Sequence, residues 1–256
     1  MGLAPLWRLR EAPDDNAADP AVEPEGAPDP ADSPGDVVAS GAIAAVPSAA
    51  AVPPAVALDA AVAPVPDAED DGAWERLERE IRDCTACPLH RQRRQAVPGI
   101  GDRRPRWLVV GEGPGAEEDR RGEPFVGPAG QLLDAMLAAV GLSRQQGAFI
   151  ANSVKCRPPG NRTPETEEIA SCFPFLRRQV RLLAPRLIVA VGRPAAQALL
   201  NQPVRIADAR GKTFEFEGIP VIVTYHPAYL LRNPHDKGKA WEDLCRARAM
   251  SRAAGQ

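Results

Sequence analysis

The sequence predicts an α/β fold, a three-layer αβα arrangement around a small, mainly parallel four-stranded sheet. Three observations lead to this prediction. Residues 1–73 differ so much in composition from the rest of the chain that only residues 74–256 are expected to form a domain. Within that domain, four short apolar runs alternate with helical patterns, as in right-handed strand–helix–strand units. Each apolar run is followed closely by Gly, Asn or His, so unusual residues gather at one end of the predicted sheet.

The first 73 residues carry 14 Asp and Glu against only Arg8 and Arg10, and 12 of the 28 prolines. Such a segment cannot bury enough apolar area to offset its chain entropy, so we predict a disordered tail. Residues 74–256 then hold 29 Lys and Arg against 20 Asp and Glu. The net charge of -3 therefore conceals a basic domain, which suits a polyanionic partner, beside an acidic tail.

The sequence also indicates a compartment. No segment reaches the roughly 18 apolar residues that a membrane span needs, so no membrane contact is expected. The first residues lack the basic region and apolar core of a secretory signal. We therefore expect a cytoplasmic protein, in which clustered cysteines indicate metal binding or catalysis more often than disulfides.

The elements follow in order from Trp74, which shares one helical face with Leu77 and Ile81. The strands are apolar runs typical of strands buried on both faces. They are predicted at residues 107–110, 149–154, 187–191 and 219–225. The helices that separate and follow them are predicted at residues 130–140, 164–183, 194–200 and 239–249.

Ligands bind sheets of this kind at the carboxyl ends of the strands. The unusual residues fall at those ends: Glu112 after the first strand, Asn152 near the end of the second, Gly192 after the third and His226 after the fourth. The turn after the first strand also satisfies the dinucleotide-binding pattern G-x-G-x-x-A. The acidic residues between 112 and 119 would repel a pyrophosphate, and no lysine in the turn compensates for them, so no nucleotide cofactor is expected.

Four cysteines form the pattern C-x2-C, a long gap and C-x15-C: Cys84, Cys87, Cys156 and Cys172. A tight C-x2-C turn supplies two converging thiolates for a metal site. Zinc sites more often present a second tight pair, so the wide second spacing favours an iron–sulfur cluster, with zinc as the alternative. The fifth cysteine, Cys245, fits a buried free thiol on the last helix.

Four motifs in this order resemble the type 4 (family 4) uracil-DNA glycosylases, the iron–sulfur branch of that superfamily. They are CTACPL at 84–89, GEGPGAEEDRRGEPFVGPAGQLL at 111–133, NSVKCRPPGNR at 152–162 and YHPAYLLR at 225–232. The resemblance implies a [4Fe-4S] cluster on the four cysteines. It also implies that the protein hydrolyses the N-glycosidic bond of uracil in single- or double-stranded DNA and leaves an abasic site. We expect a monomer; the tail lies outside the resemblance, and a repair or replication partner for it is a hypothesis.

The resemblance also assigns roles at the strand ends. Glu112 would act on the sugar side, either by polarising the attacking water or by stabilising the sugar cation. His226 would hydrogen-bond uracil O2 as negative charge develops there. Asn152 would read uracil N3–H and O4, a pattern that cytosine reverses. Phe125 would supply the aromatic face on which uracil stacks.

Gly113 and Glu118 would shape the base pocket. Glu118 matches the position that crowds the uracil C5 edge and excludes the methyl group of thymine. Both residues could instead permit a wider pocket, so a sister glycosylase for another deaminated base is the closest alternative. A non-hydrolytic iron–sulfur electron carrier or DNA-binding protein is the alternative from another class.

Tyr229, Leu230, Leu231 and Arg232 resemble the loop that enters the DNA helix as the base leaves, with an apolar wedge and a phosphate-binding arginine. Ordinary packing of the two leucines in a protein helix is the alternative. Seven further arginines are predicted to contact the DNA backbone: Arg91, Arg93, Arg94, Arg103, Arg104, Arg157 and Arg162.

Overall fold

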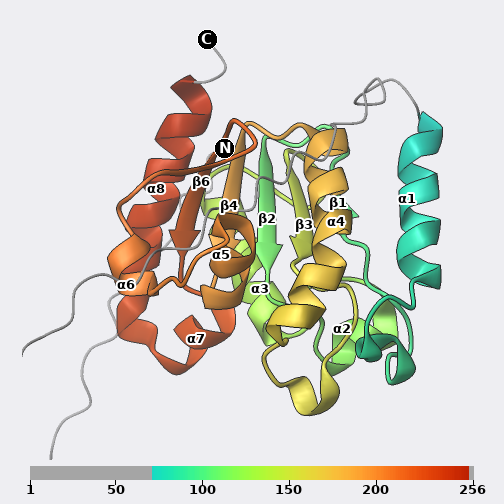
Figure 1. Ribbon diagram of the computed structural model, residues 1–256. Helices are drawn as coiled ribbons and strands as arrows, with labels where there is room; N and C mark the ends of the chain where they lie inside the picture. Colours follow the sequence, from blue (N-terminus) through green and yellow to red (C-terminus); the bar gives the residue numbers. More distant parts are fainter. Residues whose placement is uncertain (1–70, 254–256) are drawn as a thin grey trace, which may run out of the picture. The chain divides into compact units, whose positions relative to one another are not determined.

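The computed structural model describes residues 71–253, and residues 1–70 of the predicted disordered tail lie outside this range. The predicted α/β fold with a mainly parallel sheet is confirmed (Figure 1). The sheet has six strands, in the order β1-β3-β2-β4-β6-β5. The four predicted strands are its parallel centre: β2 (Trp107–Gly111), β3 (Ala148–Asn152), β4 (Leu187–Val191) and β6 (Ile219–Thr224). The predicted count of four is too low, because two short antiparallel edge strands lack a long apolar run: β1 (Ile100–Gly101) and β5 (Phe214–Phe216).

The five predicted helices are present, with ends shifted by a few residues. They are α1 (Asp71–Asp83), α3 (Pro128–Ala139), α4 (Thr166–Leu183), α5 (Arg193–Leu200) and α8 (Lys237–Ala253). Helix α1 begins inside the segment predicted as tail, and Ala73 and Trp74 are buried. The short helices were not predicted: α2 (Ala116–Arg121), α6 (Ile206–Ala209), α7 (Pro227–Arg232) and single 3-10 turns at Pro88–Arg91, Pro159–Asn161 and Pro234–Asp236. Within residues 71–253, no helix has the length and apolar content to cross a membrane.

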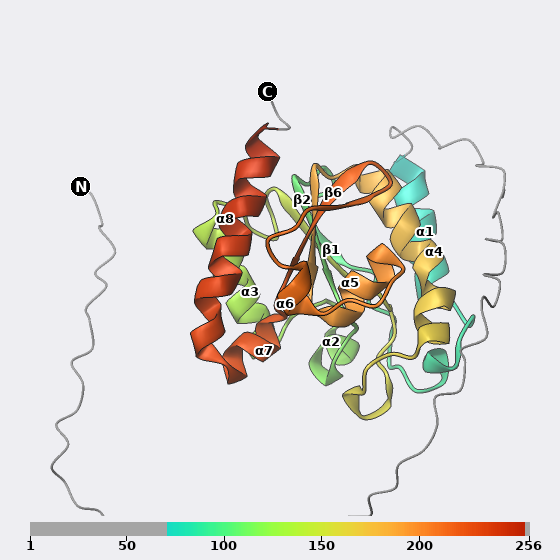
Figure 2. The same ribbon diagram turned by 60° about the vertical axis from the view of Figure 1, so that its left-hand side comes forward.

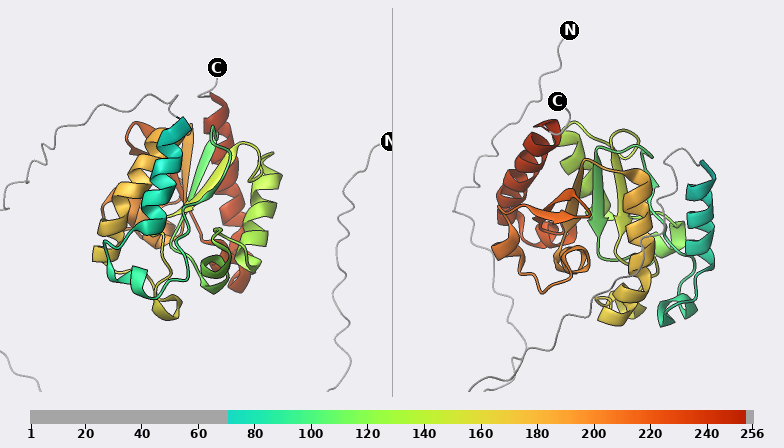
Figure 3. Two further views of the ribbon diagram at one scale, coloured as in Figure 1. Left: turned by 90° about the vertical axis from the view of Figure 1, so that its right-hand side faces the viewer. Right: turned by 45° about the horizontal axis from the view of Figure 1, so that its top comes forward.

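Side chains point alternately to the two faces of the sheet along each strand, so each face packs against its own layer of helices. On one face, Leu108 and Val110 pack in a cluster with Leu176 of α4 and side chains of α1 and α5. On the other face, Val109 packs with Leu137 of α3 and side chains of α8. Figure 2 shows α3 and α8 on one side of the sheet and α1 and α4 on the other, and the left view of Figure 3 shows the same layers nearly edge-on.

The strand register brings the predicted site residues to one end of the sheet. Gly111 pairs with Asn152 across β2 and β3, so the turn after β2 begins beside Asn152. On the other side, the Gly192 N–H donates to the Thr224 carbonyl (2.9 Å), which places the start of α5 next to His226. Helices α2 and α7 lie at this same end of the strands (Figure 1). The carboxyl edge of the parallel sheet is therefore enclosed by loops and short helices, as a ligand site requires.

Candidate active site

A pocket of about 520 Å3 opens at the carboxyl ends of the strands. It brings together nine of the residues predicted to act on the base or the DNA. These are Glu112, Gly113, Glu118, Phe125, Asn152, Arg162, His226, Tyr229 and Arg232. The residues come from four separate segments of the chain, so their convergence is a product of the fold.

Asn152 presents a buried carboxamide with an unused acceptor. Its side chain is 2% exposed, and its Oδ1 has no hydrogen-bond partner among the described residues. A Cβ on Gly111, the residue opposite, would lie 2.5 Å from this oxygen and 2.7 Å from the Phe125 ring. Only glycine therefore leaves room for both side chains. An unpaired buried amide is costly, so its place in a pocket wall indicates a ligand that donates a hydrogen bond.

His226 is held in one tautomer as the N-cap residue of α7. The Ala228 N–H donates to His226 Nδ1 (3.1 Å), so in the neutral ring the proton resides on Nε2. Burial, assisted by the positive charge of Arg232, lowers the pKa of His226 to about 4, and the opposing effect of Glu118 is smaller. At neutral pH the residue is thus an uncharged N–H donor at the pocket wall, suited to an oxygen that gains negative charge.

The depressed pKa of His226 makes folding stability depend on pH. The unfolded chain gains a proton near pH 6.5 and the folded protein only near pH 4, so this stabilisation is complete above 6.5 and is lost on acidification. From pH 8 to pH 5, His226 should lower the free energy of unfolding by about 2 kcal/mol. Urea denaturation at both pH values should show a smaller decrease for His226→Gln. His235→Gln, at an exposed histidine, should match the wild type, and equal decreases in all three proteins would contradict the assignment.

Glu112 follows β2 directly, at the pocket wall. Burial raises the pKa of this carboxyl, while a hydrogen bond from Thr163 and the charge of Arg193 act in the opposite direction. The two partners come from the loop before α4 and from the start of α5, and no sequence pattern marked either of them. Together they offset part of the effect of burial, and the pKa of Glu112 stays above its usual value.

Hydrogen bonds hold both the Glu118 side chain and the Phe125 backbone in place. Glu118 accepts from the Gly115 N–H (3.1 Å) and the Val126 N–H (3.0 Å), which fastens α2 to the Phe125 turn. Phe125 has a left-handed backbone (φ 54°), and its ring stacks on His226 with centroids 5.4 Å apart. Arg144, which the sequence did not single out, binds the Phe125 carbonyl (2.5 Å). The strained turn is therefore held by partners on both sides.

Residues 229–232 form helix α7 rather than a loop, because His226 and Pro227 start a helix there. Leu230 is 1% exposed and packs inside the domain, which does not fit its predicted contact with DNA. Leu231 is 43% exposed, so of the two leucines it is the one accessible to solvent, and its predicted contact with DNA stays a prediction. Tyr229 stacks on Tyr225 and donates to Asp236 (2.7 Å).

Some of the arginines predicted to contact DNA are engaged within the protein. Arg93 donates to Cys156 Sγ (3.0 Å), and Arg162 makes two hydrogen bonds to Glu168 (2.6 and 2.8 Å). Arg103 lies over the Trp74 ring, 4.1 Å from its centroid. Arg157, which is partly exposed, donates to Asn161 Oδ1 (2.7 Å). The others in the predicted set are exposed: Arg91, Arg94 and Arg104.

The four predicted metal-binding cysteines line one small cavity, together with side chains of α1, α4 and the segment after β3. N–H donors point at three of the sulfurs: Arg93 at Cys156, the Lys155 backbone at Cys172 (3.2 Å) and the Ala86 backbone at Cys84 (3.4 Å). Among residues 71–253, no group of three or more Cys, His, Asp and Glu side chains has the geometry of a metal-ion site. The prediction of a buried free thiol at the fifth cysteine is wrong, because that position on α8 faces solvent.

Lys155 connects the cysteine cavity to the pocket, a role that the sequence did not reveal. Its side chain is 1% exposed, and its Nζ donates to the Asn152 carbonyl (2.7 Å) and to Gln179 Oε1 (2.6 Å). Burial lowers the pKa of Lys155 to about 8. Gln179 in turn donates to the Pro98 carbonyl (2.7 Å). A buried polar network with every member paired fixes the backbone of Asn152.

Comparisons with known proteins identify the family of this chain. The model of the uracil DNA glycosylase superfamily matches residues 98–245. A type-4 uracil-DNA glycosylase of Pyrobaculum aerophilum is 44% identical over 178 residues, covering 66% of this chain and 90% of that protein. A type-4 uracil-DNA glycosylase of Thermotoga maritima is 42% identical, covering 71% of this chain and 96% of that protein. A type-5 uracil-DNA glycosylase of Pyrobaculum aerophilum is 35% identical, covering 52% of this chain and 66% of that protein. The chain belongs to the uracil-DNA glycosylase superfamily and, within it, to the type-4 enzymes.

Proposed function

We propose that this protein removes uracil from DNA by hydrolysing the N-glycosidic bond, which releases the free base and leaves an abasic site. The observation that carries the proposal is the buried, unpaired Oδ1 of Asn152 in a pocket that also contains a neutral His226 and a partly buried Glu112. These three side chains match the needs of a base that leaves as an anion from a sugar that becomes a cation.

The base must leave the DNA stack to enter such a pocket. Asn152 Oδ1 accepts from uracil N3–H, and the amide N–H donates to O4. Cytosine, with an acceptor at N3 and an amine at C4, would leave buried groups unpaired and is rejected. His226 Nε2–H donates to O2 as negative charge develops there. The ring is already neutral, so it acts as a hydrogen-bond donor without a change of protonation state. Glu112 acts on the sugar side, through the attacking water or through the cation itself.

We further propose that Cys84, Cys87, Cys156 and Cys172 hold a [4Fe-4S] cluster. Three features support this: all four line one cavity, N–H donors lie at three sulfurs, and the first pair has the C-x2-C spacing. When bound, the cluster would cross-link the end of α1, helix α4 and the segment after β3. Hydrolysis of an N-glycosidic bond needs no electron transfer, so we assign the cluster a structural role.

Base release from matched oligonucleotides tests the function. We expect release of uracil from single and double strands and none of thymine, because Glu118 is held rigidly at the pocket wall. Hypoxanthine and xanthine should be tested in parallel. Preferential release of either over uracil would favour the sister glycosylase, and absence of any release from iron-replete protein would overturn the enzymatic proposal.

Gly111→Ala should lower uracil release about 100-fold, because the new Cβ would displace Asn152 and Phe125. The ratio kcat/KM for a uracil-containing oligonucleotide measures this loss. Gly127→Ala is the matched control, since a Cβ there meets nothing within 4 Å. Wild-type activity in folded Gly111→Ala protein would show that Asn152 need not occupy its observed position.

A further inference from the structure

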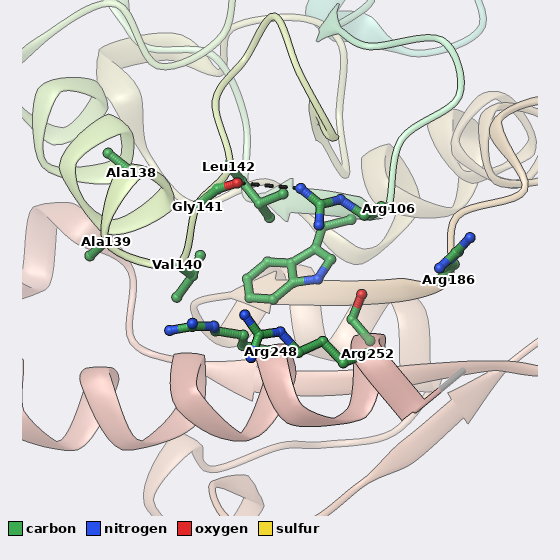
Figure 4. A pocket seen from close by; sticks show the side chains of 11 residues that line it. Arg106, Ala138, Ala139, Val140, Gly141, Leu142, Arg186, Arg248 and Arg252 are labelled. Atoms are coloured by element: carbon green, nitrogen blue, oxygen red, sulfur yellow. Dashed lines mark hydrogen bonds between the residues drawn. The ribbon is translucent and has the colours of Figure 1, made fainter. Parts of the chain in front are cut away.

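A second pocket, of about 540 Å3, lies at the opposite end of the sheet. It is lined by residues that precede β2 and β4, by the turn after α3 and by the last turns of α8. Four arginines line it: Arg106, Arg186, Arg248 and Arg252. Figure 4 shows Arg248 and Arg252 rising from α8 on one side and Arg106 lying on the other. We call this group the arginine pocket.

The arginine pocket has no acidic side chain in its lining. Within residues 71–253, none of its four guanidinium groups forms an ion pair with Asp or Glu; Arg106 donates only to the Gly141 carbonyl (3.3 Å). Elsewhere in the domain, arginines are commonly paired, as Arg144 is with Asp134. The carboxyl end of α8 favours the cation of Arg252, whereas Arg106 and Arg186 come from the loops that precede β2 and β4.

We propose that the arginine pocket binds closely spaced phosphate groups. Guanidinium groups offer paired N–H donors that match phosphate oxygens, and several of them around one cavity suit a polyanion better than a single charge. A bound polyanion would also remove the mutual repulsion of four unpaired cations.

The arginine pocket is separate from the proposed active site. Five-residue strands place roughly 17 Å of sheet between the two ends, before any loop is counted. If the active site binds a flipped nucleotide as proposed, the phosphates that flank this nucleotide would lie at the carboxyl edge, away from the arginine pocket. The phosphate groups would therefore come either from a free polyphosphate, such as that of a nucleoside triphosphate, or from DNA backbone remote from the flipped base.

Calorimetric titration of the full chain with tripolyphosphate at low salt tests the proposal. We expect one site that is weakened about tenfold or more by Arg248→Gln/Arg252→Gln. The control, Arg177→Gln/Arg181→Gln, removes the same two charges from α4, where both arginines bind Glu217. It should change the affinity no more than about twofold. Uracil release from a short oligonucleotide should be unchanged in both variants.

Two results would overturn the proposal: no binding of tripolyphosphate, or equal weakening in both double variants. Two further measurements distinguish DNA backbone from a free polyphosphate as the source of the phosphate groups. If the phosphates belong to DNA, Arg248→Gln/Arg252→Gln should flatten the salt dependence of binding to a long duplex. If they belong to a free polyphosphate, that dependence should match the wild type while binding of tripolyphosphate and of a nucleoside triphosphate is weakened.

Discussion

Asn152→Ala is expected to lower kcat/KM for uracil release about 100- to 1000-fold while the fold and the iron content remain as in the wild type. The variant removes both the acceptor for uracil N3–H and the donor for O4, and it leaves water or an empty space in a buried wall. The backbone at position 152 should stay in place, because Lys155 donates to the carbonyl of residue 152 and this residue pairs with Gly111 in the sheet.

The isosteric variant Asn152→Asp separates hydrogen bonding from packing. A carboxylate has nearly the same shape but no donor for O4, so uracil release should fall as far as in Asn152→Ala. Single-turnover release, thermal unfolding and iron content should be measured on all three proteins. Retention of activity by Asn152→Asp would mean that the side chain fills space rather than reading the base.

The sequence predicted the layers and the parallel centre of the sheet because both depend on long, regular patterns. Residues 187–191 form a short apolar run that is buried over its whole length, and the runs that became β2 and β3 share this pattern. The edge strands were missed because two or three residues give no pattern, and they pair only once their neighbours exist. Helix α7 was considered only as the alternative to a DNA-entering loop, because six residues after His226 are too few to show a helical period.

Site residues that directly follow a strand could be predicted from the sequence. Site residues whose role depends on a tertiary contact were missed. Glu112, Asn152 and His226 could be placed because the carboxyl ends of parallel strands meet at one edge. Thr163 acts only through its proximity to Glu112, and Arg144 only through a turn 19 residues away. For Lys155 a weak signal existed: a lysine so close to a buried strand must either reach solvent or find partners in the interior.

The hydrogen bonds of Lys155 also explain why loss of the cysteine site should alter the active site. The Lys155 backbone N–H donates to Cys172 Sγ, and the Lys155 side chain donates to the Asn152 carbonyl. Cys172→Ser should therefore lose iron, lower the melting temperature by about 10 °C or more and reduce uracil release together, because α4 and the segment after β3 lose their cross-link.

Cys245→Ser is the matched control for that prediction, since its thiol is exposed on α8 and lines neither cavity. It should retain iron, melting temperature and activity. Iron content by absorbance and metal analysis, thermal unfolding and single-turnover release at a temperature where Cys172→Ser is still folded distinguish the causes. A folded, iron-free and fully active Cys172→Ser protein would show that the cysteine site does not position Asn152. An iron-free protein that stays folded but releases uracil slowly would indicate that the cluster acts through Lys155 on the base-reading residue.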